Sequence, residues 1–356
     1  MQPISTVPRT DPVLYWLISV YLMVAAMITI GGITRLTGSG LSMVDWRPLM
    51  GTIPPVTEEQ WAAVFSQYQL FPQYEQVNHW MQLDDFKRIF FWEYLHRLFG
   101  RLIGIVFFLP MMWFIIKEDL AGKWIPKALM AFTLGGLQGI LGWYMVKSGL
   151  VDEPAVSHYR LTAHLTLAFI IGGYLWWLFL ERSSLTRDAC RTSANHYRFG
   201  PILLSISALQ VVYGGLMAGT RAGFMYSTFP DMNGTFVPDG LFALDSLWSN
   251  LVDNPICIHF VHRSLGWLLL ALGLWVGFQG SHHAHTRWQR QASRFLMGAL
   301  SFQFMVGVAT VTLEIPVAVG AIHQVGAFIS VSAILAYMHA HPRHKITRDN
   351  PEPAIH

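Results

Sequence analysis

A carboxylate, an imidazole and two guanidiniums lie within residues 92–101, directly before the apolar run of residues 102–116. A membrane-spanning helix needs roughly 20 residues, so this short run predicts that the charged stretch forms the first turns of the same helix. Ionisable groups at membrane depth are costly and indicate function. Glu93 and His96 share one helical face, which makes Glu93 a candidate for proton transfer and His96 a candidate metal ligand.

Three further histidines open or lie within apolar stretches: His164, His262 and His323. Each of the four histidines is followed four residues later by a small residue. These are Gly100, Ala168, Gly266 and Ala327. A small residue one turn away leaves room beside the imidazole for a large, flat ligand. Small residues also let membrane helices approach one another, and the pattern alone does not separate the two interpretations.

Paired neutral imidazoles at one depth suit haem iron, with the macrocycle between helices. Arg97 and Arg263 directly follow two of the histidines and are placed to donate charge-assisted hydrogen bonds to haem propionates. The alternative is that these arginines extend to lipid headgroups. Zinc fits poorly, because it needs three or four close ligands.

Composition places the chain in the membrane. Of its 356 residues, 53% are hydrophobic and only 13% are charged, far more apolar than a soluble domain. The two cysteines, Cys190 and Cys257, match no metal or redox spacing, and we expect no nucleic-acid partner. Residues 13–33 lack a basic presequence or cleavage site, so we expect them to form the first helix of the mature protein.

Eight stretches are long and apolar enough to span a bilayer. They cover about residues 13–33, 90–116, 124–146, 161–180, 199–219, 255–280, 295–313 and 317–338. The ends and alternate connections on one side carry 14 Lys/Arg against 7 Asp/Glu, and the opposite side carries 10 against 14. The positive-inside rule then predicts that both termini are cytoplasmic and that all four histidines lie near the outer surface.

An internal repeat divides the chain into halves of four spans. Residues 31–35 resemble residues 214–216 followed by 220–223, and residues 137–142 resemble residues 302–307. Four spans per half make the repeats parallel. We therefore predict an all-α membrane protein of two pseudo-symmetric four-helix bundles, residues 1–190 and 191–356.

Aligning His96 with His262 places Glu93 opposite His259. The N-terminal half alone then has a carboxylate one turn from its histidine, which predicts that catalysis occurs there. The alternative is that Glu93 only pairs with Arg97 four residues later.

The first outer connection, residues 34–89, has aromatic residues near helical spacing: Trp61, Phe65, Tyr68 and Trp80. We expect interfacial helices there. They would act either as a lid over a pocket or as aromatic anchors at the membrane surface.

Several blocks together resemble the haem A synthase family. They are residues 31–44 (GGITRLTGSGLSMV), 93–97 (EYLHR), 218–223 (AGTRAG), 228–234 (TFPDMNG), 260–263 (FVHR) and 322–324 (IHQ). The resemblance spans nearly the whole chain. Because this chain lacks the paired outer-loop cysteines of one branch, it resembles the branch with a longer first outer loop.

The resemblance implies oxidation of the C8 methyl group of haem O to a formyl group, which gives haem A for terminal oxidases in the bacterial cytoplasmic (inner) membrane. It implies that substrate haem faces His96 and His164, and that His262 and His323 ligate a haem b cofactor. Haem O is the implied substrate. Haem O synthase, an electron donor and a second copy of the chain are candidate partners, and the sequence does not determine the oligomeric state. Two alternatives are a bis-haem b electron-transfer protein without haem-modifying activity, and an eight-span transporter whose histidines relay protons.

Overall fold

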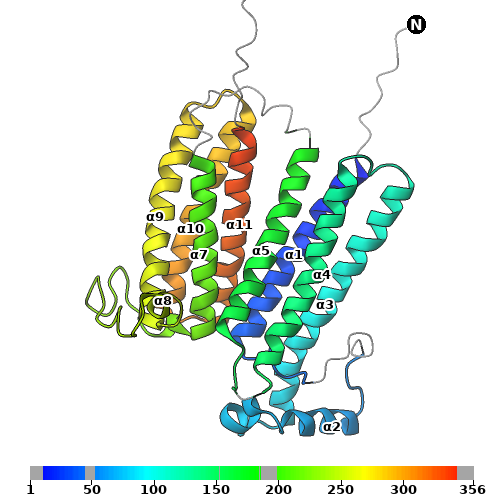
Figure 1. The fold of residues 1–356 in the computed structure, drawn as a ribbon, viewed down its shortest axis with the longest axis vertical. Helices are drawn as coiled ribbons and strands as arrows, with labels where there is room; N and C mark the ends of the chain where they lie inside the picture. The colour runs from blue at the N-terminus through cyan, green and yellow to red at the C-terminus, as the bar shows by residue number, and fades with distance from the viewer. Residues whose placement is uncertain (1–10, 45–52, 152, 184, 186–198, 343–356) are drawn as a thin grey trace, which may run out of the picture.

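The fold is that of a computed structural model, which describes residues 11–44, 53–151, 153–183, 185 and 199–342 (Figure 1). Within these residues all regular structure is helical, apart from one isolated bridge between Met232 and Thr235. The prediction of an all-α protein is confirmed. The connection between the halves, including Cys190 and the predicted boundary at residue 190, lies outside the described residues.

Eight helices of the described residues are long and apolar enough to cross a membrane, which confirms the predicted number of spans. They are α1 (Pro12–Leu36), α3 (Leu83–Ile116), α4 (Trp124–Ser148), α5 (His158–Arg182), α7 (Phe199–Thr220), α9 (Pro255–His282), α10 (Arg287–Thr312) and α11 (Val317–Ala340). The charged residues 92–101 are part of α3, but they do not form its first turns as predicted, because α3 already begins at Leu83.

Two of these helices begin about two turns before the predicted spans. A capping box at Gln82 and Asp85 starts α3, and another at Thr286 and Gln289 starts α10. Hydropathy marks only the lipid-crossing part of a helix, whereas the helix itself continues to the residue that satisfies its first N–H groups. The predicted starts at residues 90 and 295 were therefore wrong.

The helices pack in two sets of four. In one set α1, α3, α4 and α5 pack in succession and α5 returns to α1; in the other α7, α9, α10 and α11 do the same. Between the sets α5 packs on α7 and α11, and α1 packs on α11 (Figure 1). Exchanging the two halves leaves the list of these helix pairs unchanged, and the parallel repeat itself stays a prediction.

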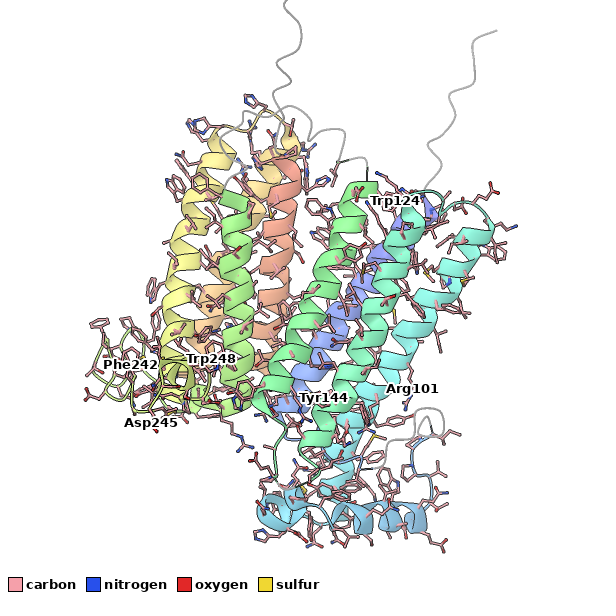
Figure 2. All side chains as sticks on the ribbon, in the orientation of Figure 1. Arg101, Trp124, Tyr144, Phe242, Asp245 and Trp248 are labelled. Atoms are coloured by element: carbon pink, nitrogen blue, oxygen red, sulfur yellow. The ribbon has the colours of Figure 1, made fainter. Side chains whose placement is uncertain are left out.

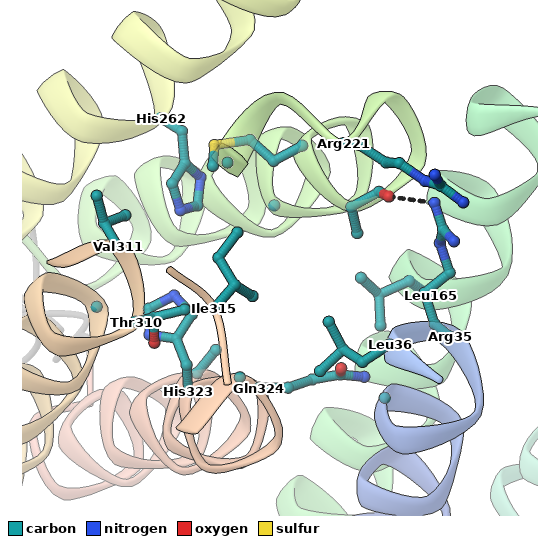
Figure 3. Close-up of a pocket in the computed structure, with 18 of the residues that line it drawn as sticks. Arg35, Leu36, Leu165, Arg221, His262, Thr310, Val311, Ile315, His323 and Gln324 are labelled. Atoms are coloured by element: carbon teal, nitrogen blue, oxygen red, sulfur yellow. Dashed lines mark hydrogen bonds between the residues drawn. The ribbon is translucent and has the colours of Figure 1, made fainter. Parts of the chain in front are cut away.

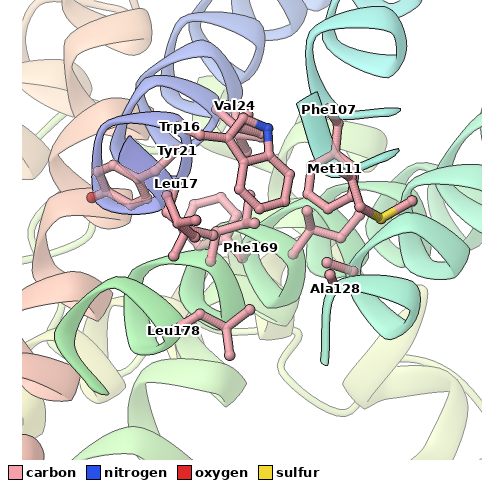
Figure 4. Packing of buried hydrophobic residues seen from close by; sticks show 14 of the residues in the cluster. Trp16, Leu17, Tyr21, Val24, Phe107, Met111, Ala128, Phe169 and Leu178 are labelled. Atoms are coloured by element: carbon pink, nitrogen blue, oxygen red, sulfur yellow. The ribbon is translucent and has the colours of Figure 1, made fainter. Parts of the chain in front are cut away.

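The N-terminal set has an aromatic core (Figure 4). The Trp16 ring of α1 lies 4.8 Å from that of Phe107 on α3, between ring centroids, and both pack near Phe169 of α5. The peripheral helix α4 has only 6% of its spanning window buried, whereas α11 has 44%. The central helices are therefore those at the junction of the two sets.

The junction is held by α1 and α11. The Tyr21 ring stacks on Phe328 at 5.2 Å, and its hydroxyl is 2.7 Å from the Ser332 hydroxyl. A Cβ on Gly172 of α5 would lie 2.2 Å from the Phe328 ring. Glycine is thus the residue that lets this ring enter between the two sets.

The start of α1 and the end of α11 lie at the same end of the molecule (Figure 1). The connections from α1 to α3 and from α7 to α9 lie at the other end. Figure 2 shows Trp124 and Tyr144 near opposite ends of α4, as is typical of aromatic residues at the two membrane interfaces. Which end faces the cytoplasm stays a prediction.

A small outer layer covers the start of α3. It contains α2 (Glu58–Tyr68) and the π-helix η2 (Tyr74–Asn78), so the expectation of helices in this connection is confirmed. Trp61 and Phe65 pack around buried Tyr68, whereas the side chain of Trp80 is 59% exposed.

Polar contacts fasten the outer layer to the end of α1. Burial raises the pKa of Tyr68 to about 12, so its hydroxyl stays protonated. This hydroxyl donates to Gln73 Oε1 at 3.0 Å, and Gln73 Nε2 donates to the Gly38 carbonyl at 2.9 Å. The second long connection contains a 3₁₀ turn, η4 (Ala222–Phe224), and α8 (Leu247–Val252).

Candidate functional site

His262 of α9 and His323 of α11 face one another across a cavity of about 990 Å³ (Figure 3). Their ring centroids are 6.4 Å apart and their planes are inclined at 73°. Two imidazoles that share one metal at about 2.0–2.1 Å from each nitrogen have ring centres roughly 6 Å apart. The observed spacing therefore fits a single metal ion held between the two rings.

The cavity is walled mainly by the C-terminal set of helices. Apolar residues such as Leu269 and Phe304 alternate with a few polar groups, among them Gln210 and Gln303. Its volume is at the upper end of the about 300–1,000 Å³ typical of small-molecule sites. Trp80 of the connection between α1 and α3 also lines it, and a lid function of this connection stays a prediction.

Each of the four histidines lies against a glycine of a neighbouring helix. A Cβ added to these glycines would approach a ring atom as follows: Gly31 to His96 at 3.3 Å, Gly142 to His164 at 3.0 Å, Gly214 to His262 at 3.5 Å and Gly307 to His323 at 2.9 Å. Gly31 aligns with Gly214, and Gly142 with Gly307, in the repeated blocks. The two halves thus cradle their imidazoles in the same way.

Three glutamines approach the imidazole nitrogens. The amide nitrogens of Gln138, Gln210 and Gln303 lie 3.3, 3.3 and 3.2 Å from a ring nitrogen of His164, His262 and His323. Within the described residues, the Oε1 atom of each glutamine is buried without a partner. Such atoms are rare in folded proteins. Gln210 and Gln303 also line the cavity, whereas Gln138 does not.

Glu93 of α3 is only 2% exposed and accepts three hydrogen bonds. The donors are Ser42 Oγ at 2.7 Å, Met43 N at 2.8 Å and Arg97 Nη2 at 2.5 Å. Arg97 also donates to the Met43 carbonyl at 2.9 Å. The ion pair expected from the i,i+4 spacing is present, and it fastens the segment after α1 to α3.

The matching pair in the C-terminal half fastens a second segment. His259 Nδ1 donates to the Ala222 carbonyl at 2.9 Å, and its Nε2 accepts from Arg263 Nε at 2.9 Å. Arg263 further donates to the carbonyls of Asp231 at 2.6 Å and Tyr226 at 3.1 Å. Arg263 lines the cavity, whereas Arg97 does not.

Residues 14–335 match the model of the COX15-CtaA family, described as cytochrome oxidase assembly protein. The chain belongs to this family. Proteins named "Heme A synthase" from Nitrosomonas eutropha and Nitrosospira multiformis are each 41% identical to it, over 91% and 94% of the chain and 92% and 97% of their own lengths. That from Parvibaculum lavamentivorans is 39% identical over 94% of the chain and 97% of its own length.

In this member of the COX15-CtaA family, the sequence predicted the four histidines but only part of the residues that surround them. Gly266 and Ala327 line the cavity, as expected of small residues one turn from a histidine. Gly100 instead packs against Met27, whose Cε would be 3.1 Å from an added Cβ. The glycine cradles and the glutamines were not predicted, although the repeated blocks around residues 31, 142, 214 and 307 carry most of them.

Glu93, His96, Arg97 and His164 lie in the N-terminal set of this family member, and His262, Arg263 and His323 lie in the C-terminal set. Their predicted roles toward haem stay predictions at this point. Cys257 is buried, and assignment to the branch without paired cysteines also stays a prediction.

Proposed function

We propose that this protein is a haem A synthase, an integral membrane oxidoreductase that converts the C8 methyl group of haem O to the formyl group of haem A for terminal oxidases. The observation that carries the proposal is the pair of facing imidazoles, His262 and His323, across a large, mostly apolar cavity. Relatives named for this activity match nearly the whole chain.

In this proposal His262 and His323 hold a haem b cofactor in the C-terminal half. The glycine cradles keep the rings accessible, and the buried glutamine oxygens offer acceptors beside them. Bound haem supplies the iron redox chemistry. The protein would supply two imidazoles to hold the iron and apolar walls to exclude water, and Arg263 holds the connection after α7.

Substrate haem would bind in the N-terminal half beside His96 and His164. Oxidation of a methyl group to a formyl group releases protons, and Glu93 lies one turn from His96, where it is placed to accept them. Arg97 holds the Glu93 carboxylate and the Met43 carbonyl, so it orients both the acid and the covering segment.

The proposal includes two four-helix bundles as parallel repeats, residues 1–190 and 191–356, with both termini in the bacterial cytoplasm and both haem sites near the outer surface. The charge difference between the two sides of the membrane supports this orientation. Haem O synthase and an electron donor are the proposed partners, and self-association is a further expectation.

Haem analysis tests the function. We would co-express the protein with a haem O source, extract the haems and separate them, and record reduced-minus-oxidised spectra of the purified protein. We expect haem A with the wild type, and no haem A with His164→Ala while haem b is retained. A protein that retains haem b but never yields haem A contradicts the proposal.

One observation favours a second candidate, a bis-haem b electron-transfer protein. The three hydrogen bonds of Glu93 give that residue a structural role without any catalysis, so its presence no longer argues against this alternative. Two low-spin haem b groups per chain, with haem O unchanged, would establish it.

A further inference from the structure

An arginine of the N-terminal half reaches the cavity of the C-terminal half. Arg35, at the end of α1, lines this cavity. Its Nη2 donates to the carbonyls of Ala218 at 2.6 Å and Gly219 at 3.4 Å, in the last turn of α7. Its Nε is buried without a partner among the described residues. Arg35 is therefore fixed in place while part of its guanidinium stays available to another acceptor.

Arg221 lies next to Arg35 and follows α7 directly. Its backbone is left-handed, with φ of 57°, a conformation that is uncommon for residues other than glycine and is often found at functional sites. It lines the cavity, and within the described part of the chain its side chain makes no hydrogen bond or ion pair. Figure 3 shows the two guanidiniums beside one another, on the side of the cavity away from His262 and His323.

Two adjacent guanidiniums repel one another. Arg35 is half-buried and Arg221 is exposed, so water screens part of this repulsion. None of the ion pairs within the described residues gives either arginine a carboxylate. Arg263, the cavity arginine predicted from sequence, already donates to three protein acceptors. Arg35 and Arg221 together therefore form the part of the wall with most positive charge and most unused donors.

We propose that Arg35 and Arg221 are the carboxylate-binding end of this cavity and take the propionates of the tetrapyrrole whose iron lies between His262 and His323. This inference rests on the proposed function, because that function places a haem there. Guanidiniums bind carboxylates through paired hydrogen bonds. The side chains that Figure 3 shows between the two ends of the cavity include Leu36, Leu165 and Ile315, which suit an apolar ring. Retention of the C-terminal cofactor then depends on a residue of the N-terminal half.

The test compares haem b with its dimethyl ester, in which both carboxylates are blocked. Each form is loaded into the full-length protein in detergent, and its loss to excess apomyoglobin is followed spectroscopically. The variants are Arg221→Gln, which breaks no hydrogen bond or ion pair within the described residues, and Arg35→Lys, which keeps the charge but loses the planar fork. Arg88→Gln is the control, because Arg88 is exposed on α3 and does not line the cavity.

We expect the wild type and Arg88→Gln to retain the acid form at least about tenfold longer than the ester, as hydrogen bonds between charged groups would give. Arg221→Gln and Arg35→Lys should lose the acid form about tenfold faster and the ester at the wild-type rate. A structural defect would accelerate both losses equally. An unchanged ratio of acid to ester retention in both variants overturns the inference.

Haem A formation by the wild type is measured separately, so the two proposals fail separately. A wild type that makes no haem A but retains haem b in an Arg221-dependent way contradicts only the proposed function. A wild type that makes haem A, with variants that show no change in the ratio, contradicts only the propionate assignment.

Discussion

Replacing Glu93 by glutamine tests whether this carboxylate does chemistry or only holds a segment. The substitution keeps the shape of the side chain but turns one of two acceptor oxygens into a donor. The remaining oxygen cannot serve Ser42 Oγ and Met43 N on one side and Arg97 on the other. One of these donors must then lose its acceptor.

The loss of stability expected for Glu93→Gln follows from the burial of the ion pair between Glu93 and Arg97. The side chains of Glu93 and Arg97 are 3% and 11% exposed, and breaking a buried ion pair by removing one partner costs about 3–5 kcal/mol. Removing only the hydroxyl, in Ser42→Ala, takes away one hydrogen bond and should cost about 1 kcal/mol. We therefore expect thermal unfolding in detergent to occur at a clearly lower temperature for Glu93→Gln than for Ser42→Ala.

Measurements of haem A formation separate a catalytic role of Glu93 from a role in anchoring the segment. If Glu93 accepts protons, Glu93→Gln loses most haem A formation with haem b retained, whereas Ser42→Ala keeps it. If Glu93 only anchors the segment, haem A formation falls in step with stability in both variants. His259→Gln is the matched control, because His259 occupies the equivalent position and also anchors a segment; it should cost much less activity.

Two outcomes refute this reasoning. Wild-type haem A formation by Glu93→Gln, or a larger loss in His259→Gln with haem b retained, excludes catalysis by Glu93 in the N-terminal half. Equal stability of Glu93→Gln and Ser42→Ala excludes a stabilising buried ion pair.

Three further predictions use other contacts. His262→Ala or His323→Ala should strip tightly held haem b, measured by pyridine haemochrome, since each removes an axial imidazole; normal haem b content in both would refute the assignment. Gly142→Ala should displace the His164 ring and lower haem A formation, while Gly139→Ala on the same helix, with open space at its Cβ, should not; equal activities would show that the cradle is unimportant. Gly172→Ala should destabilise the junction between the two sets by about 1–3 kcal/mol, as overpacking does, seen as a lower unfolding temperature in detergent; an unchanged temperature would show that the ring relocates freely.

The sequence by itself determined the eight spans and the helix faces of the candidate histidines. Hydropathy and helical periodicity are local properties, and a chain in lipid must satisfy its backbone hydrogen bonds within each helix. The class of fold and the positions of His164, His262 and His323 near helix starts could therefore be predicted, whereas His96 lies deeper in α3, which begins at Leu83. The aligned blocks at residues 31 and 214 predicted a parallel repeat of the two halves, but not which helices pack on which.

Tertiary structure decided what faces each side chain across helices. The contact of Gly31 with His96, and the reach of Arg35 to the end of α7, join residues on different helices, and the periodicity of one helix carries no information about the rotation or depth of its neighbour. The roles of Arg97 and Arg263 illustrate this. Their position beside histidines predicted ligand binding, but the carbonyls of Met43, Tyr226 and Asp231 come within hydrogen-bonding distance only when the connections fold back over the helices.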